Sequence, residues 1–228
     1  NYPPEISIEA AEVDGFPSPE DLHDQTEWTT IVPRSPVDGD SENRFTVASD
    51  ARWTHVKLSI YPDGGVARLR VLGRGKPDPT FLAAGPVDLA ALENGAYVSA
   101  CSNMFYSSPN NLLFPGPPRS MGEGWETSRR RNDANDWVQV QLAGTGRISL
   151  AELDTSCFLG NAPGAATLRG RLGAGEWIEL LPRTTLQPDT RHRFVLTHDT
   201  PVSEVRMDIF PDGGMARLRL FGDLDTSA

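Results

Sequence analysis

The sequence predicts an all-β protein made of two tandem β-sandwich domains of jelly-roll type. Three observations predict this class: an internal repeat, short runs in which apolar and polar residues alternate, and many turn-forming residues between these runs. The chain of 228 residues contains 21 Gly and 19 Pro, which favour frequent turns over long helices. Its hydrophobic content of 38% is sufficient for a packed core.

The internal repeat is clearest in the segment 60–70, which recurs as 209–219. Both segments contain Pro-Asp-Gly-Gly, followed after one residue by Ala-Arg-Leu-Arg. The shift that carries Pro62 onto Pro211 also relates Glu27-Trp28 to Glu176-Trp177, Pro33-Arg34 to Pro182-Arg183, Arg44-Phe45 to Arg193-Phe194, and Gly73 to Gly222. One register that holds over so many pairs predicts two copies of one domain.

The two copies are not equally complete. Asn1-Tyr2-Pro3 aligns with Asn161-Ala162-Pro163, so residues 88–160 of the second copy have no counterpart in the first. We predict the C-terminal part of a first repeat at 1–75, a linker at 76–87, a complete second repeat at 88–222 and a tail at 223–228. An incomplete sandwich exposes its inner face and unpaired strand edges, so we expect an earlier start of the native chain, or another chain or segment that fills the gap.

Each copy is predicted to end in a β-hairpin. Residues 55–60 and 204–209 alternate between polar and apolar side chains, and Pro-Asp-Gly-Gly then supplies turn residues. The strands that follow are expected to bury Ala67, Leu69 and Val71 in the first copy, and Ala216, Leu218 and Leu220 in the second. Their other face carries Arg68, Arg70, Arg217 and Arg219, either as a solvated surface or as part of a site.

Further strands are predicted throughout the second copy, at 137–142, 147–154, 166–172, 176–181 and 193–197. Gly144-Thr145-Gly146 is expected to form a turn between the first two of these strands. A short helix is predicted at 87–93, because Pro86 precedes it and Gly95 follows it.

The formal net charge of −10 and the pI near 4.8 argue against broad binding to nucleic acid or to anionic membranes. No apolar run in the sequence is long enough to span a bilayer, and the first residues do not resemble a signal peptide. Cys101 and Cys157 are the only cysteines and form no Cys-x-x-Cys pair, which favours a reducing, cytoplasmic setting. We expect no metal and no cofactor.

The segment Gly124–Arg131 places a carboxylate, an indole, a hydroxyl and three guanidinium groups within eight residues. Arginine side chains bind carboxylates through two parallel hydrogen bonds, and Glu126 is suited to acid–base chemistry. The functional interpretation is therefore an anion-binding site beside a carboxylate, and the alternative is a solvated charged loop. Trp125 and Trp137 favour a site, since mobile surface loops rarely contain two tryptophans.

Several of these stretches together resemble the allantoicase family, and the resemblance extends over nearly the whole chain. The matching residues are Asn103, Ser107 to Leu113, Pro115-Gly116, Met121 to Thr127, Arg129 to Arg131, Asp136-Trp137, Asp154-Thr155, Phe158, Gly160-Asn161, and both copies of the Pro-Asp-Gly-Gly motif. The resemblance implies two tandem jelly-roll domains of the galactose-binding-like kind. It also implies hydrolysis of allantoate to ureidoglycolate and urea in purine degradation.

The sequence departs from the family pattern at four positions. Asn135 stands where the family commonly has His, and Cys157 stands where it commonly has His or an aromatic residue. Leu159 stands where a basic or polar residue is usual, and Ser128 stands where a further basic residue is usual. The loss of an imidazole removes the side chain that most readily transfers protons at neutral pH, so this copy is interpreted as a weakened site.

The resemblance and the residue types suggest roles for nine residues. One of Arg129, Arg130 and Arg131 is expected to hold the substrate carboxylate, because neighbouring residues of a strand cannot all point inward. Glu126 and Asp154 are proposed as the catalytic acid and base. Trp125, Thr127, Asp136 and Asn161 are proposed to contact the substrate. The alternatives are a core or inter-domain position for Trp125 and turn or capping roles for Asp136, Asp154 and Asn161.

Two other functions stay open at this point. One is a non-catalytic module that binds sugars, which the arginine cluster disfavours. The other is a degenerate allantoicase-like protein with a structural or assembly role. The expected partner is a small-molecule substrate, allantoate, with no nucleic acid and no membrane, and the incomplete first domain favours a homo-oligomer.

Overall fold

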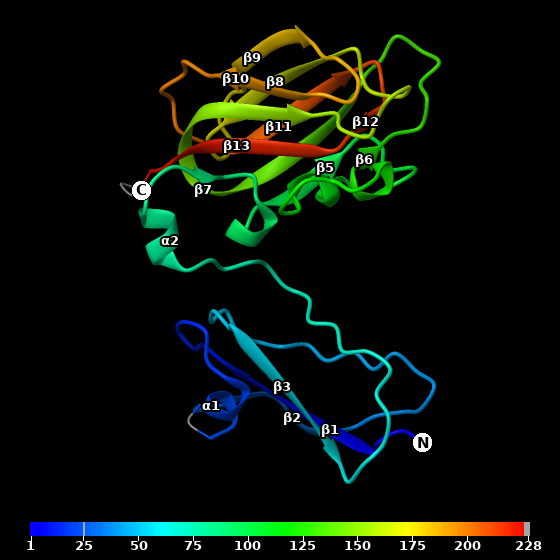
Figure 1. The fold of residues 1–228 in the computed structure, drawn as a ribbon, viewed down its shortest axis with the longest axis vertical. Coiled ribbons are helices and arrows are strands. Elements are labelled where there is room, and N and C mark those ends of the chain that lie inside the picture. Colours follow the sequence, from blue (N-terminus) through cyan, green and yellow to red (C-terminus); the bar gives the residue numbers. More distant parts are fainter. Residues whose placement is uncertain (25, 226–228) are drawn as a thin grey trace. The chain divides into compact units, whose positions relative to one another are not determined.

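The computed structural model describes residues 1–24 and 26–225 and divides into two compact units, Asn1–Gly73 and Arg74–Ala228 (Figure 1). The division falls close to the predicted end of the first repeat. Among the described residues, no helix is both long and apolar enough to cross a membrane.

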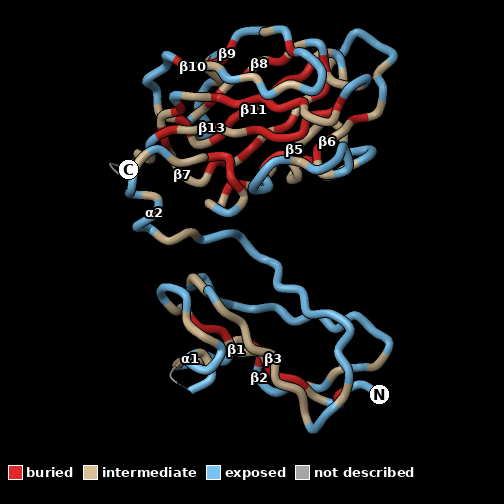
Figure 2. Tube along the Cα trace, in the orientation of Figure 1, coloured by how far each residue is buried: buried red, intermediate tan, exposed pale blue. Residues whose placement is uncertain are grey.

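Unit 2 is an antiparallel β-sandwich, and Figure 2 shows that its buried residues lie mainly along its strands. Its elements are α2 (Pro79–Ala83), β4 (Val87–Asp88), η1 (Leu92–Asn94), β5 (Tyr97–Cys101), η2 (Pro109–Leu113), η3 (Met121–Glu123), β6 (Trp125–Glu126), β7 (Asp136–Asp154), β8 (Ala165–Arg171), β9 (Ile178–Thr185), β10 (Arg191–Val195), β11 (Val202–Phe210), β12 (Gly214–Met215) and β13 (Arg217–Leu224).

The long strand β7 belongs to both layers of the sandwich. Its first half pairs with β11 and β5, and its second half pairs with β13 and β10. The chain does not turn at residues 144–146, so that prediction was wrong. Gly146 is buried, and a side chain there would meet the Asp223 carbonyl oxygen at 2.6 Å. Glycine at this position is therefore required by close packing within a continuous strand.

The Pro-Asp-Gly-Gly motif of unit 2 connects the two layers instead of closing a hairpin. β11 and β13 both pair with β7, at its two ends, and not with each other. The predicted hairpin was therefore wrong, although both of its strands exist. Local alternation and turn residues do not reveal which strand becomes the hydrogen-bonding neighbour.

The helix predicted at 87–93 was also wrong. Val87–Asp88 forms β4 and pairs with β13, and only a 3₁₀ turn follows, at Leu92–Asn94. Gly95 does end this turn, with a positive φ of 100°. Asp88 accepts hydrogen bonds from the backbone N–H groups of Ala90 and Leu220, which fixes β4 against β13. Of the predicted tail, Asp223 and Leu224 continue β13, and residues 226–228 lie outside the described part of the chain.

Unit 1 repeats one edge of the sandwich. It contains β1 (Glu5–Ala11), α1 (Pro19–Asp24), β2 (Thr29–Pro36) and β3 (His55–Tyr61), in the sheet order β2-β1-β3. The pairs Glu5–Tyr61 and Glu5–Pro36 match the unit 2 pairs Ala165–Phe210 and Ala165–Thr185. Strands β2, β1 and β3 are therefore the equivalents of β9, β8 and β11, in the same register.

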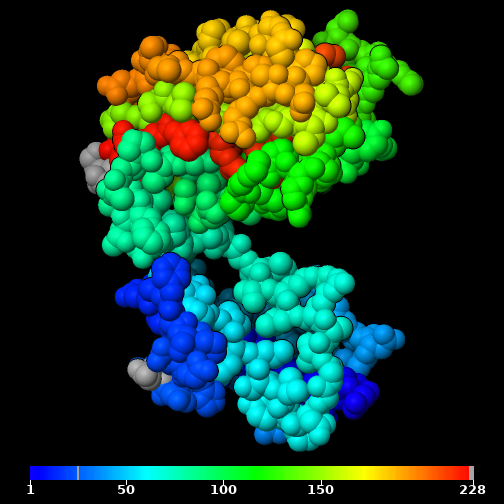
Figure 3. Space-filling view, viewed as in Figure 1, coloured from blue at the N-terminus to red at the C-terminus, as the bar shows by residue number. Residues whose placement is uncertain are grey.

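The strand predicted at 67–71 is absent from unit 1, and the expected burial of Ala67, Leu69 and Val71 was wrong. All three are exposed, and Leu72 is 90% exposed. Figure 3 shows this segment, in cyan, on the surface of unit 1. The equivalent strand β13 is held by β7, and the described residues of unit 1 include no strand equivalent to β7.

Candidate active site

The turn at residues 211–215 is the centre of the candidate site. Asp136 donates its backbone N–H to the Pro211 carbonyl oxygen at 3.0 Å, and Arg130 donates its backbone N–H to the Asp212 carboxylate at 2.7 Å. Thr127 and Gly213 exchange hydrogen bonds through both backbone and hydroxyl groups. Three consecutive residues of the repeated motif, 211–213, thus hold Asp136, Arg130 and Thr127 respectively.

The same turn holds two further elements. Gly214 donates its backbone N–H to the Asn161 carbonyl oxygen at 2.8 Å, and β12 pairs with β6 so that Gly214 lies opposite Glu126. An added side chain at Gly214 would meet the Phe158 ring at 1.9 Å, so the close approach requires glycine. The motif therefore gathers segments that are far apart in the sequence.

An ion pair between a half-buried arginine and a buried aspartate lies beside this turn. The Arg130 Nη2 atom is 2.5 Å from the Asp136 Oδ1 atom, and the side chain of Asp136 is completely buried. Ser102 donates its hydroxyl to the same Oδ1 atom at 2.7 Å and accepts the Trp137 backbone N–H at 2.9 Å. The Asp136 Oδ2 atom and the Arg130 Nε atom have no hydrogen-bond partner among the described residues.

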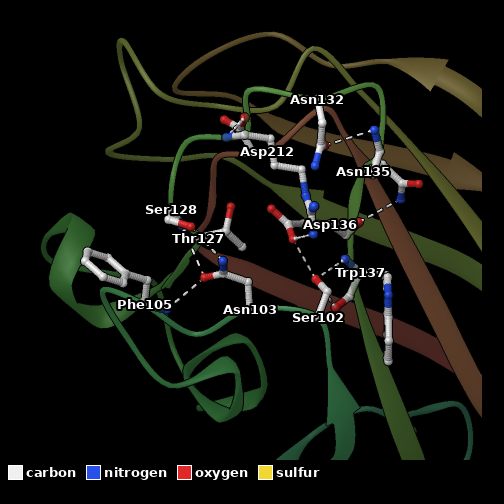
Figure 4. Close-up of polar contacts among 12 residues, drawn as sticks. Ser102, Asn103, Phe105, Thr127, Ser128, Asn132, Asn135, Asp136, Trp137 and Asp212 are labelled. Carbon is white, nitrogen blue, oxygen red and sulfur yellow. Dashed lines mark hydrogen bonds and ion pairs between the residues drawn. The ribbon is translucent and has the colours of Figure 1, made fainter.

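A second network holds the loop that carries these residues, as Figure 4 shows. Asn103 accepts the backbone N–H groups of Ser128 and Phe105 and donates its amide to the Ser128 hydroxyl at 2.7 Å. The Asn103 carbonyl oxygen accepts the indole N–H of Trp125, which is fully buried. Trp125 and the buried Thr127 therefore position the loop, and their direct contact with substrate stays a prediction.

Glu126 and Asn161 meet on the other side of the turn. The Asn161 amide donates to the Glu126 Oε1 atom at 2.7 Å. The Glu126 backbone N–H donates to the Ser107 hydroxyl at 2.9 Å, and its side chain is partly exposed. This geometry holds one carboxylate oxygen in place and leaves the carboxylate accessible from solvent.

Only Arg130 of the three consecutive arginines is held in the fold. Arg129 and Arg131 are exposed, and neither forms a hydrogen bond or ion pair with a residue described by the structure. Asp154 lies at the end of β7, is 1% exposed, and accepts the Ser156 backbone N–H at 2.8 Å. Its Oδ2 atom is 3.8 Å from the Arg191 side chain. A catalytic role for Asp154 stays a prediction.

Two of the replaced family positions have local roles in the structure. The Asn135 amide donates to the Asp208 carboxylate at 3.1 Å and to the Asp136 carbonyl oxygen at 2.9 Å. Cys157 has a positive φ of 72°, and its backbone N–H donates to the Asp189 carboxylate at 2.8 Å. Among the described residues, no group of three or more His, Cys, Asp and Glu side chains is arranged to hold a metal ion.

Sequence reasoning missed Ser102 and Asp212 as members of the site, although Asp212 belongs to the repeated motif. It also left open whether Arg217 is solvated. Arg217 is 3% exposed and donates to the carbonyl oxygens of Gly116, Asn111, Glu123 and Ala216. Burial and then the charge of Arg219 lower the pKa of Arg217. This side chain anchors the loops at 109–123, so the interpretation of a solvated strand face was wrong for Arg217.

Comparison with known proteins identifies the family. The model of the allantoicase repeat family matches residues 1–76 and 87–225. The probable allantoicase of Nocardia farcinica is 60% identical over 225 residues, which cover 98% of this chain and 68% of that protein. The probable allantoicase of Streptomyces coelicolor is 52% identical over 227 residues, 98% of this chain and 60% of that protein.

A solved structure gives the same result. The crystal structure of allantoicase from Saccharomyces cerevisiae matches with a TM-score of 0.83 and 35% identity, over 96% of this chain and 68% of that one. The chain thus spans about three fifths to two thirds of the length of these relatives. The family model, the relatives and the shared fold all cover nearly the whole of this chain, which therefore belongs to the allantoicase family.

Proposed function

We propose that this chain acts in the hydrolysis of allantoate to ureidoglycolate and urea, in the degradation of purines. One observation carries the proposal: in a chain of the allantoicase family, a single turn gathers Glu126, Arg130, Asp136 and Asn161. The arrangement offers a partly exposed carboxylate and, held by the same turn, a guanidinium–carboxylate pair whose aspartate is buried. This combination suits a small acid that carries ureido groups.

The reaction replaces a carbon–nitrogen bond of allantoate by a carbon–oxygen bond to water. The departing ureido nitrogen must gain a proton and the attacking water must lose one. Glu126 is our candidate for this proton transfer, since its carboxylate is accessible and is oriented by Asn161. Asp154 is proposed as the second carboxylate, and Asp136, Thr127 and Trp125 as residues that bind substrate or shape its site.

The test is direct measurement of urea release from allantoate, with this chain and with a form as long as the relatives. Urea production by this chain supports the proposal, and its absence from both forms contradicts it. Release by the longer form alone would place the working site, or a part of it, outside these residues. A cytoplasmic location is a further prediction, which cell fractionation would test.

A non-catalytic, assembly-type role is the second candidate. The observation that favours it is the replacement of the usual family imidazole by Asn135, whose amide is already bonded to Asp208. In that case the longer form would release urea at an unchanged rate after Glu126 is replaced by Gln.

A further inference from the structure

The Arg130–Asp136 pair contains two buried polar atoms that the fold leaves unpartnered. Asp136 is completely buried, yet only its Oδ1 atom accepts hydrogen bonds, from Ser102 and Arg130. The Asp136 Oδ2 atom and the Arg130 Nε atom have no partner among the described residues. Native proteins satisfy nearly all such groups with protein atoms, ordered water or a bound molecule, so this acceptor and this donor are candidates for contact with a ligand.

The charges of the pair limit the kind of ligand. The guanidinium and the carboxylate neutralise each other at a distance of 2.5 Å, so the pair carries no net charge toward a third group. A carboxylate ligand at this point would bring a second negative charge close to Asp136, which disfavours the ionised form of one of the two groups. A neutral group with both a donor and an acceptor avoids this repulsion.

A ureido group has the required pattern, because it carries N–H donors next to a carbonyl acceptor. We propose that the Arg130–Asp136 pair binds a neutral ureido group of allantoate, with Asp136 Oδ2 accepting a ureido N–H and Arg130 Nε donating to the ureido carbonyl. This inference rests on the proposed function, and it removes Arg130 from the three arginines that the sequence suggested for the substrate carboxylate. The substrate carboxylate then falls to Arg129 or Arg131, whose charges no described residue neutralises.

The pair is fixed in place before any ligand arrives. The Arg130 backbone is held by Asp212, and the Asp136 backbone is held by the Pro211 carbonyl oxygen. Ser102 fixes the Oδ1 side of the carboxylate, as Figure 4 shows. A site that is already ordered loses little conformational entropy on binding, which favours recognition of a small, neutral group.

Inhibition of allantoate hydrolysis by urea and by acetate tests the inference, in whichever form of the protein releases urea. Urea represents the ureido group and acetate represents the carboxylate. Asp136→Asn replaces the acceptor at Oδ2 by an amide donor. We expect at least a tenfold rise in the inhibition constant of urea and in the KM for allantoate, with the constant for acetate changed less than twofold.

Asp133→Asn is the matched control, since it makes the same change at an exposed aspartate three residues before Asp136 and leaves the Arg130–Asp136 pair intact. It should leave urea inhibition unchanged. If Asp136→Asn weakens inhibition by acetate instead of inhibition by urea, the pair binds the substrate carboxylate and the inference is overturned. If neither inhibition constant changes, Asp136 Oδ2 and Arg130 Nε do not contact the substrate, and the inference also fails.

Arg130→Lys is a second variant for the case in which Asp136→Asn does not fold. Lysine keeps an ion pair with Asp136 but lacks the Nε donor of arginine. We expect weaker urea inhibition with an unchanged melting temperature, and unchanged inhibition would contradict the inference. If no form releases urea, the proposed function fails. Binding of urea to the wild-type chain and to this variant, followed by NMR, then tests the pair alone.

Discussion

At the scale of single residues, Glu126 combines access to solvent with a fixed orientation. Asn161 holds its Oε1 atom at 2.7 Å, and β6 fixes its backbone. Replacement by Gln keeps the shape and removes the ability to transfer a proton. We expect Glu126→Gln to lower kcat by about 10²- to 10⁴-fold, with a much smaller effect on KM. Steady-state kinetics of urea release on the active form would measure both constants.

Glu123 provides the control for this prediction. It lies three residues before Glu126, and its side chain pairs with the exposed Arg119, whose hydrogen bond lowers the pKa of Glu123. Glu123→Gln should leave kcat unchanged. An equal loss of kcat in both variants would show that the effect of Glu126→Gln comes from altered surface charge and not from proton transfer.

Gly214 shows how one small residue determines the geometry of the site. A side chain there would lie 1.9 Å from the ring of Phe158, which is completely buried. We expect Gly214→Ala to destabilise the protein by about 1–3 kcal/mol, because overpacking forces the ring or the turn to move. Gly160→Ala is the control, since no atom of a residue beyond its two chain neighbours lies within 4 Å of the added carbon. Urea unfolding of both variants would measure the difference, and equal stabilities would contradict this account.

The sequence predicted the segment that carries the site better than it predicted the partners of that segment. Glu126, Arg130, Asp136 and Asn161 come from stretches with unusual local composition, which sequence reasoning can detect. Ser102 and Asp212 were missed because a serine or an aspartate beside a turn looks the same whether or not it faces a site. Only the pairing of distant strands brings them to Asp136 and Arg130.

At the scale of elements, the alternation of side chains predicted most strands of unit 2 but not their connections. β7 was predicted as two strands because Gly144-Thr145-Gly146 has the composition of a turn. In the structure, the small residues instead allow close contact with neighbouring chain segments such as Asp223. Composition cannot distinguish a turn from a position of close packing. Likewise, the Pro-Asp-Gly-Gly motif and the strands on either side of it did not reveal that the motif connects the two layers.

Arg217 links β13 to the loops that precede the site. Its guanidinium donates to four carbonyl oxygens and is 3% exposed. Arg217→Met leaves several of these buried acceptors unsatisfied, so we expect a loss of about 3 kcal/mol in unfolding free energy. Hydrogen exchange should also become faster at residues 109–124.

Arg68 is the matched control for Arg217, because it occupies the equivalent position in the first repeat and is exposed. Arg68→Met should change the unfolding free energy by less than about 0.5 kcal/mol. Similar losses in the two variants would mean that the buried carbonyl contacts of Arg217 do not contribute to stability.

The carboxylate of Asp208, in β11, makes the stability of the protein depend on pH. Burial pushes the pKa of Asp208 upward, but hydrogen bonds from Arg206, Arg169 and Asn135 outweigh it, so the pKa lies below its ordinary value. A lowered folded-state pKa stabilises the protein above the unfolded pKa of about 4, and this stabilisation disappears as the pH falls through the folded pKa.

The wild type is expected to lose unfolding free energy as the pH falls below 5, and Asp208→Asn should lose less over the same range. Urea unfolding at each pH would measure both. The variant should also be less stable than the wild type at pH 7. Glu20→Gln on the exposed α1 helix is the control, and its pH profile should follow the wild type. If the unfolding free energy of Asp208→Asn falls with pH as steeply as that of the wild type, the ion pairs of Asp208 do not cause the pH dependence.

At the scale of the whole molecule, the repeat was the most reliable prediction from sequence, because one shift relates many residue pairs. In the structure, β1, β2 and β3 of unit 1 are the equivalents of β8, β9 and β11, although, of these three, the sequence predicted a strand only at β3. The fate of residues 66–72 was not predictable from the motif itself. Those residues have the sequence of a strand, yet a strand forms only where a neighbour provides hydrogen bonds.

The exposed segment after β3 predicts association of the chain. Val66, Leu69, Val71 and Leu72 are 44%, 45%, 65% and 90% exposed, and several exposed apolar side chains in one short segment favour contacts between molecules. We expect light scattering after size exclusion to give a mass above the 24.9 kDa of one chain. The double substitution Val71→Asp and Leu72→Asp should lower that mass, since it places charge in the contact. Phe81→Asp, in α2 of unit 2, is the control for added surface charge. A monomeric wild type, or an equal effect of the control, would contradict association through residues 66–72.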